Sequence, residues 1–241
     1  MAFPSAAFDR ASQLQHEGLT CFVEGRGLPE AMRSLKAALV EFQALLVDFD
    51  HQGAAMPPTP QTNTCASSTC NPVRMVEVPG VNDPDFYIHR HAFLISDDGQ
   101  ETCNDGLQKL TASIVLSLFN MGLLLTQSNR EETLQKACSI YQTAIQAAEG
   151  ENLLASHGFN LVVLAAMNNQ AWLLKKLGRI QEASDLLEQM ADLIHQARHC
   201  RNRDAWSHEE YDIILNFMGN LSTETDGTDL AATHYFAAPS A

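Results

Sequence analysis

The stretch that decides the fold is residues 168–183, which read NNQAWLLKKLGRIQEA. Apolar residues recur at intervals of three and four on both sides of Gly178, and this spacing places them on one face of an α-helix. A glycine directly after the last residue of such a pattern is typical of a helix end. The stretch therefore predicts two helices that meet at Gly178. The second has one continuous apolar stripe: Ile180, Ala183, Leu186, Leu187, Met190, Leu193, Ile194 and Ala197.

The same 3.6-residue period extends in both directions from this stretch. Ser207 and Glu210 add a capping-box pattern, which marks the start of a last helix. We therefore expect an all-α-dominated chain of about seven helices in antiparallel pairs. Their predicted ranges are 9–25, 28–49, 106–127, 130–149, 155–177, 179–199 and 207–221.

An insertion at 51–105 interrupts the helical pattern. Its first part, 51–72, is rich in Pro, Thr and Ser, and we expect it to be flexible. Two strand-like runs follow, near 73–78 and 86–95, with turn residues such as Pro79-Gly80 between them. The insertion therefore predicts a β-hairpin at about 73–95 that must pack on the helices, because a lone hairpin is marginal in water. We treat 1–241 as a single domain with a flexible tail at 222–241.

The helix pairs share an internal pattern. Small residues recur where the two helices of a pair would cross, and large residues recur beside them, as expected when stacked pairs bury a continuous core. The small residues are Gly18, Gly122 and Ala171 on first helices, and Ala31, Ala137 and Ala183 on second helices. The large residues are Leu35, Tyr141 and Leu187.

This pattern resembles the tetratricopeptide repeat (TPR), and the resemblance covers about 170 of the 241 residues. It implies a TPR-like α-solenoid of three helix pairs, closed by helix 207–221 and carrying the inserted β-hairpin. The layout as a whole is also similar to uncharacterised TPR-like proteins of diatoms, which implies no particular function.

The resemblance further implies that the first helices line a groove for a partner peptide or protein. An asparagine in such a groove can hydrogen-bond an extended backbone, Trp172 offers apolar area, and Leu116 and Leu123 are expected to pack in the core. A basic clamp for an acidic chaperone tail is missing, so we exclude that ligand. The candidate partner-binding residues are Gln15, Phe22, Asn120, Gln127, Asn168, Trp172, Lys175 and Lys176.

Composition restricts the partners. The formal net charge of −14 argues against nucleic acid, because phosphate contacts need clustered Lys and Arg. The most apolar stretch, 114–125, is shorter than the roughly 20 residues of a bilayer span, so we expect no membrane. The first ten residues lack a signal-peptide pattern, and the six cysteines form no regular framework. We therefore expect an intracellular, cytoplasmic protein with free thiols.

Sites for chemistry are weak by comparison. Metal sites can be imagined at Cys65 and Cys70 with His89 and His91, but the two cysteines are five residues apart rather than in the tight pair that zinc favours. His195 and His199, next to Cys200, share a helix face, which is a ligand geometry, but no further acidic or cysteine ligand can be assigned to them. No nucleophile-elbow, phosphate-loop or HExxH pattern occurs. We therefore predict no metal, no cofactor and no enzymatic activity. The alternatives are an enzyme or regulatory domain with a site at residues 86–95, and a self-associating scaffold in which homo-oligomers form.

Overall fold

The computed structural model describes residues 5–53, 73–80, 82–95, 106–150, 153, 157–200 and 207–225. Within these ranges the chain is mostly helical, with two short strands. The strands are β1 (Val73–Glu77) and β2 (His91–Ile95). The helices are α1 (Ser5–Val23), α2 (Leu28–Gly53), α3 (Gly106–Leu125), α4 (Glu131–Gly150), α5 (His157–Lys176), α6 (Ile180–Cys200) and α7 (His208–Thr225). The seven predicted helices are confirmed.

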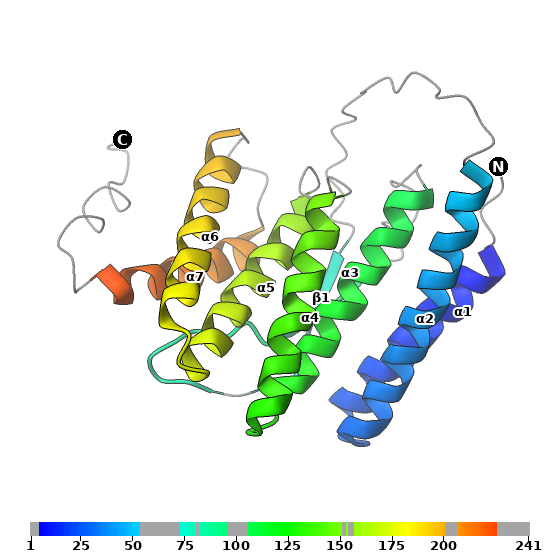
Figure 1. The fold of residues 1–241 in the computed structure, drawn as a ribbon, viewed down its shortest axis with the longest axis horizontal. Coiled ribbons are helices and arrows are strands. Elements are labelled where there is room, and N and C mark those ends of the chain that lie inside the picture. Colours follow the sequence, from blue (N-terminus) through cyan, green and yellow to red (C-terminus); the bar gives the residue numbers. More distant parts are fainter. Residues whose placement is uncertain are drawn as a thin grey trace.

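Helices α1 to α6 stand side by side in the order of the sequence, and α7 runs crosswise to them (Figure 1). Each packs on the next along the chain, from α1 on α2 to α6 on α7. Alternate helices also touch: α1 contacts α3, α3 contacts α5, and α5 contacts α7. The odd-numbered helices therefore form a continuous layer.

Two glycines let helices cross closely. A Cβ added to Gly18 would lie 3.0 Å from Cγ of Leu35, and one added to Gly122 would lie 2.8 Å from the Tyr141 ring. These distances leave no room for a larger residue. The predicted pairing of small and large residues at these two crossings is confirmed.

Two of the inter-helix turns share a backbone conformation. Gly25 and Gly178 have φ angles of 71° and 72°, in the left-handed region that glycine adopts without strain. In each turn the next residue donates its N–H to a carbonyl five residues earlier, Arg26 to Cys21 at 2.8 Å and Arg179 to Leu174 at 2.9 Å. This bond is typical of a glycine-terminated helix. The predicted end at Gly178 is confirmed.

Helix α3 forms the centre of the core. By length and composition alone it could cross a bilayer, because the helix has 20 residues and its mean hydropathy reaches 1.4, so it is longer than the apolar stretch 114–125. However, 83% of its most apolar window is buried inside the fold, and core helices commonly pass the same test. Its apolar character is accounted for by contacts with α2, α4, α5 and β2.

The inserted hairpin differs from the prediction in one respect. β1 and β2 pair antiparallel, from Val73 opposite Ile95 to Glu77 opposite His91. Residues 86–90 were predicted as strand, but they lie before β2 without forming part of the ladder. The reason is that most of their main-chain hydrogen bonds go to helix side chains rather than to β1.

The beginnings of the two regions predicted to be flexible are helical. Helix α2 continues to Gly53 and helix α7 to Thr225, each beyond its predicted end. The extra residues carry no apolar stripe, so periodicity missed them. The rest of the predicted flexible segment and tail, 54–72 and 226–241, lies outside the described residues.

Candidate functional site

The inserted segment, residues 82–95, lies along one side of the odd-numbered helices. Side chains of α3, α5 and α7 bond to its main chain, and together they form what we call the segment-binding face. This face consists of Asn120, Asn168, Asn169 and Asn220. All four asparagines are buried.

Three of these asparagines each bond to both main-chain groups of one segment residue. In each case the asparagine Oδ1 accepts from the residue's N–H, and its Nδ2 donates to the same residue's carbonyl. The pairs are Asn120 with Phe93 (3.0 and 2.8 Å), Asn169 with His89 (2.9 and 2.9 Å) and Asn220 with Tyr87 (2.8 and 2.9 Å). A backbone amide presents the same donor and acceptor to a neighbouring strand.

The bonded residues share one edge of the extended chain. In a strand, main-chain groups of alternate residues point to the same side. Tyr87, His89 and Phe93 point to the helices, whereas the carbonyl of Arg90 accepts from the N–H of Val78, on the β1 side. The asparagines therefore occupy the edge of the segment where a third strand would otherwise pair. This arrangement covers an edge that would be prone to pairing with other chains.

Hydrogen bonds with other buried side chains help to hold Asn168, Asn169 and Asn220 in place. Asn220 Nδ2 donates to Asn168 Oδ1 at 2.6 Å, and Asn168 Nδ2 donates to the Tyr87 carbonyl at 2.9 Å. Asn169 Nδ2 contacts the Tyr141 hydroxyl at 3.3 Å. Burial raises the pKa of that hydroxyl, so it stays protonated. The Asn168–Asn220 and Asn169–Tyr141 bonds thus help to orient these amides toward the segment.

An acidic residue anchors the start of the segment. Asp83 Oδ2 accepts from Trp172 Nε1 at 2.9 Å and lies 3.2 Å from Lys176 Nζ. The bond from Trp172, with smaller contributions from the Asp85 N–H and Lys176, keeps the pKa of Asp83 below its usual value. Lys176 Nζ also lies over the Trp172 ring, at 5.5 Å from its centroid. The C-terminal end of α5 is therefore a polar site for a carboxylate.

Two further helix residues contact the insertion. Lys175 Nζ lies over the buried Phe86 ring, at 4.8 Å from its centroid, which is a cation–π contact. Gln127, just after α3, donates its Nε2 to the Pro79 carbonyl at 2.9 Å. The contacts with the insertion thus extend from the end of α3 to α7.

His89 occupies the most enclosed position on the segment. Its ring stacks on Phe93 at 5.0 Å and 9°, and meets the edges of Phe119 and Phe217 at 6.0 Å each. Neither ring nitrogen has a hydrogen-bond partner among the described residues. Burial, together with His91 at 5.2 Å between ring centroids, lowers the pKa of His89 to about 3. The side chain is therefore a neutral polar ring in an aromatic pocket.

Of the eight residues predicted to bind a partner, six contact the insertion: Asn120, Gln127, Asn168, Trp172, Lys175 and Lys176. The other two are used elsewhere. Gln15 on α1 is buried and donates its Nε2 to Ser117 Oγ on α3 at 3.0 Å, and Phe22 packs against the core. Six of the candidates therefore lie against the chain's own insertion, and whether they bind a partner stays a prediction.

Two residues of the face were not among the candidates, Asn169 and Asn220. A signal was available in the sequence, because each odd-numbered helix from α3 onward carries asparagine inside a run of apolar residues. A buried amide must be hydrogen-bonded, so an asparagine in such a run indicates a polar partner inside the core.

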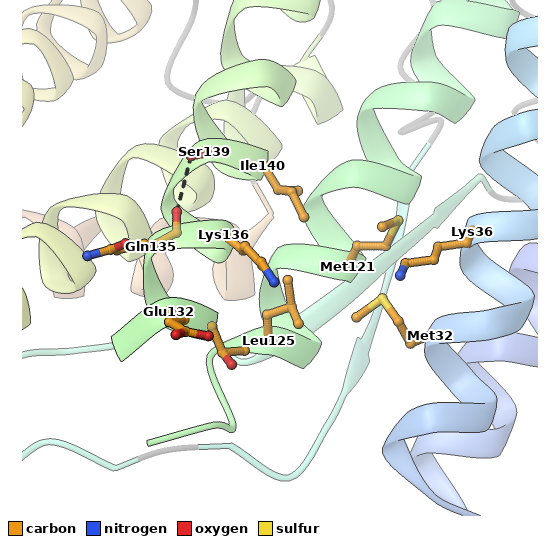
Figure 2. Close-up of a pocket in the computed structure, with 10 residues that line it drawn as sticks. Met32, Lys36, Met121, Leu125, Glu132, Gln135, Lys136, Ser139 and Ile140 are labelled. Carbon is orange, nitrogen blue, oxygen red and sulfur yellow. Dashed lines mark hydrogen bonds between the residues drawn. The ribbon is translucent and has the colours of Figure 1, made fainter. Parts of the chain in front are cut away.

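A separate cleft of about 710 Å³ lies between α2 and α4, with α3 between them (Figure 2). Met121 and Leu125 of α3 line it, and Lys36 and Lys136 point into it from opposite sides. Since Asn120 and Met121 are consecutive, they project about 100° apart on α3. The cleft and the segment-binding face therefore lie on different sides of that helix.

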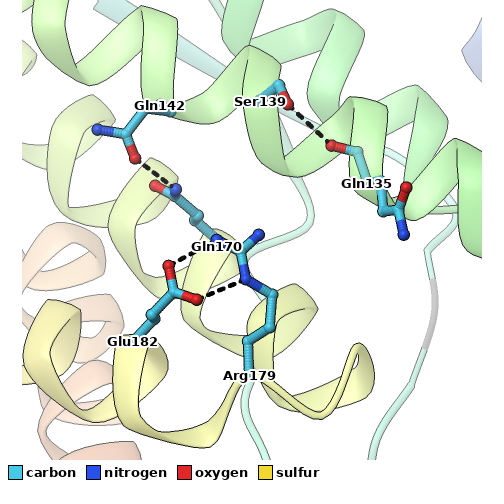
Figure 3. Close-up of polar contacts among 6 residues, drawn as sticks. All are labelled: Gln135, Ser139, Gln142, Gln170, Arg179 and Glu182. Carbon is cyan, nitrogen blue, oxygen red and sulfur yellow. Dashed lines mark hydrogen bonds and ion pairs between the residues drawn. The ribbon is translucent and has the colours of Figure 1, made fainter.

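A second polar cluster connects α4, α5 and the turn before α6 (Figure 3). Gln170 Nε2 donates to Gln142 Oε1 at 2.8 Å, and Arg179 forms two bonds to the Glu182 carboxylate. The Arg179–Glu182 pair is exposed, so it adds little to stability. This cluster brings no nucleophile and base together.

No group of three or more His, Cys, Asp or Glu in the part of the chain that the structure describes is placed to hold a metal ion. Cys65 and Cys70, imagined as ligands, lie outside it. No family model, curated protein or solved structure matches this chain.

Proposed function

We propose that this protein is a non-catalytic binding module with a TPR-like groove, which holds an extended segment of a partner protein along α3, α5 and α7. One observation carries the proposal: three buried asparagines each bond both main-chain groups of one residue in an extended segment. That chemistry recognises polypeptide.

Reading the main chain gives affinity for any extended peptide, and side-chain pockets add specificity, as in recognition by strand addition. The inserted segment uses both kinds of contact, since Asp83 and Phe86 add side-chain contacts to the main-chain bonds. The chain therefore carries its own ligand, which a partner must displace.

The repeat character has separate support. The close crossings at Gly18 and Gly122 are in the first two helix pairs, and the matching turns at Gly25 and Gly178 are in the first and third pairs, which supports a repeat. A cytoplasmic location agrees with the buried free thiols of Cys21 and Cys138, and the net charge of −14 favours a protein partner over nucleic acid.

An enzymatic site at residues 86–95 has little support. The ring of His89 is fully buried among aromatic side chains, where it contacts no water-borne substrate. A general base must reach the proton that it removes. The geometry of this segment therefore favours holding a peptide over chemistry.

The test changes the inserted segment and the face separately. Asp83→Ala removes the anchor of the segment but leaves the asparagines intact, so it should increase the amount of partner captured from cells that make this protein. Adding Asn169→Ala or Asn220→Ala should abolish the increase, with circular dichroism confirming that the helices remain. The same proteins captured in equal amount by all variants would overturn the proposal.

A further inference from the structure

The inserted segment fits the face well at most of its side chains, but His89 is a clear mismatch. Asp83 has its partners, Phe86 and Phe93 are buried, and three residues have both main-chain groups bonded. His89, between them, is fully buried with both ring nitrogens unbonded among the described residues. Within the same described part of the chain, His91 also has one buried unbonded nitrogen, its Nδ1, but in His89 both are unbonded, so an apolar residue would fit the surroundings of His89 better.

The reason is desolvation. Each polar nitrogen taken out of water without a new hydrogen bond weakens binding, whereas a phenyl ring of similar size has no such group. The surrounding rings of Phe93, Phe119 and Phe217 offer the imidazole contact area but no acceptor. The pocket is therefore chemically suited to an aromatic hydrocarbon side chain.

We infer that the face is specific for an extended partner segment with a carboxylate at the Asp83 position and large apolar side chains at the His89 and Phe93 positions, and that the inserted segment is a weaker copy of this ligand. This inference rests on the proposed function and names the partner's recognition sequence. Counting from the acidic residue, the aromatic positions are three, four, six and ten residues later.

The spacing follows from where the helix residues lie. Trp172 and Lys176 at the end of α5 hold the carboxylate, and Lys175 lies over the ring three residues later. Asn220, Asn169 and Asn120 then fix the main chain at the positions of Tyr87, His89 and Phe93. A partner is thus read in one register and one direction.

A weak internal copy serves a purpose. A tethered segment competes at an effective concentration of the order of 1 mM, so an optimal one would exclude every partner. A mismatch at His89 lowers its occupancy while it still covers the apolar face. A partner with an apolar residue there gains about 30-fold over the internal copy, which corresponds to about 2 kcal/mol.

The experiment uses the full-length Asp83→Ala chain and fluorescein-labelled synthetic peptides of residues 82–95. One peptide has the native sequence, one carries His89→Phe, one His89→Leu, and one Phe93→Ala. By fluorescence anisotropy, we expect the His89→Phe peptide to bind about 30-fold more tightly than the native one, with His89→Leu also tighter and Phe93→Ala weaker than native. Equal binding of the native and His89→Phe peptides would overturn the inference and leave the proposed function standing.

The same substitution in the chain itself provides a second test of the inference. Placing His89→Phe in the otherwise native chain should strengthen the internal copy and reduce binding of every added peptide by at least tenfold, without loss of helicity. A chain that binds the peptides unchanged would contradict the inference. If no peptide binds any variant, the proposed function itself fails.

Discussion

Helices α1 and α5 each carry a buried amide side chain, and the two amides have different partners. Gln15 on α1 donates to Ser117 on the neighbouring helix α3, so it joins helix to helix. Asn169 on α5 bonds both main-chain groups of His89, so it joins a helix to an extended segment. The segment-binding face therefore begins at α3, and α1 contributes only to packing.

The difference shows how a helical layer can hold an extended segment. Asn169 is one methylene shorter than Gln15, and its Nδ2 contacts the Tyr141 hydroxyl. It presents its donor and acceptor together to one residue of an extended chain. Gln15, the longer amide, donates instead to the Ser117 hydroxyl, so its donor bonds one helix to another. Loss of the Asn169 side chain leaves the N–H and the carbonyl of His89 without partners, whereas loss of the Gln15 side chain leaves no main-chain group without a partner.

The largest expected effect comes from replacing these two amides with leucine. Asn169→Leu leaves the N–H and carbonyl of His89 buried and unbonded, and should lower the free energy of unfolding by about 4 kcal/mol. Gln15→Leu should cost about 1 kcal/mol, because Ser117 keeps its bond to the Ser113 carbonyl. Urea unfolding of both variants measures the difference, and equal losses would refute the contrast.

Acidification should destabilise the packing of the segment through His89. The pKa of His89 is about 3 when folded, against about 6.5 when unfolded, so the unfolded chain binds the proton first as the pH falls. Stability is therefore complete above pH 6.5 and decreases toward pH 3, by about 2 kcal/mol between pH 7 and pH 5. His89→Phe should remove this part of the slope. Carboxylates titrate in both proteins, so the readout is the difference between their pH–stability curves.

Alanine substitutions at Gly122 and Gly18 can be compared directly, and each should have a smaller effect on stability than Asn169→Leu. Ala at Gly122 would push the Tyr141 ring, which supports Asn169, whereas Ala at Gly18 would crowd Leu35 with no asparagine behind it. Each should cost about 1–2 kcal/mol. Only Gly122→Ala should speed hydrogen exchange at the His89 amide relative to other segment amides. Equal exchange in both variants would mean that Tyr141 does not support the asparagine.

The smallest effect concerns two surface ion pairs. Lys176 pairs with Asp83, whose side chain is 13% exposed, and Arg10 on α1 pairs with Glu41, whose side chain is 34% exposed. Lys176→Ala should lower stability by about 0.5–1 kcal/mol and Arg10→Ala by about 0–0.3 kcal/mol, since exposed pairs contribute little. Thermal unfolding in low and high salt resolves the two, and a larger loss for Arg10→Ala would reverse the comparison.

The helices were predictable because their information is local. A period of 3.6 residues and a glycine at a turn are visible within one short stretch, as at Gly178. The capping box is equally local, and Ser207 and Glu210 do form both of its bonds, at 2.8 and 3.2 Å. The ends of α2 and α7 were missed because no periodic apolar residue marks them.

Two asparagines of the segment-binding face stand out in the sequence, but the main-chain groups that they bond could not be predicted. Asn120 and Asn168 stand out as amides on apolar helices, and the resemblance places them in a groove. However, the bonds from Asn169 to His89 and from Asn220 to Tyr87 join residues 80 and 133 positions apart. Alternation over residues 86–95 indicates an extended chain, but it does not indicate whether a strand or side chains will pair with it.

The bond between Tyr87 and Asn220 also bears on how the molecule melts. A simple row of helices loses its end helices independently, because each element contacts only its neighbours. Here one segment is bonded to α3, α5 and α7 together, so none of the three can separate without exposing main-chain groups on the others. Denaturation should therefore be a single cooperative event from α3 to α7, with gradual fraying confined to α1 and α2.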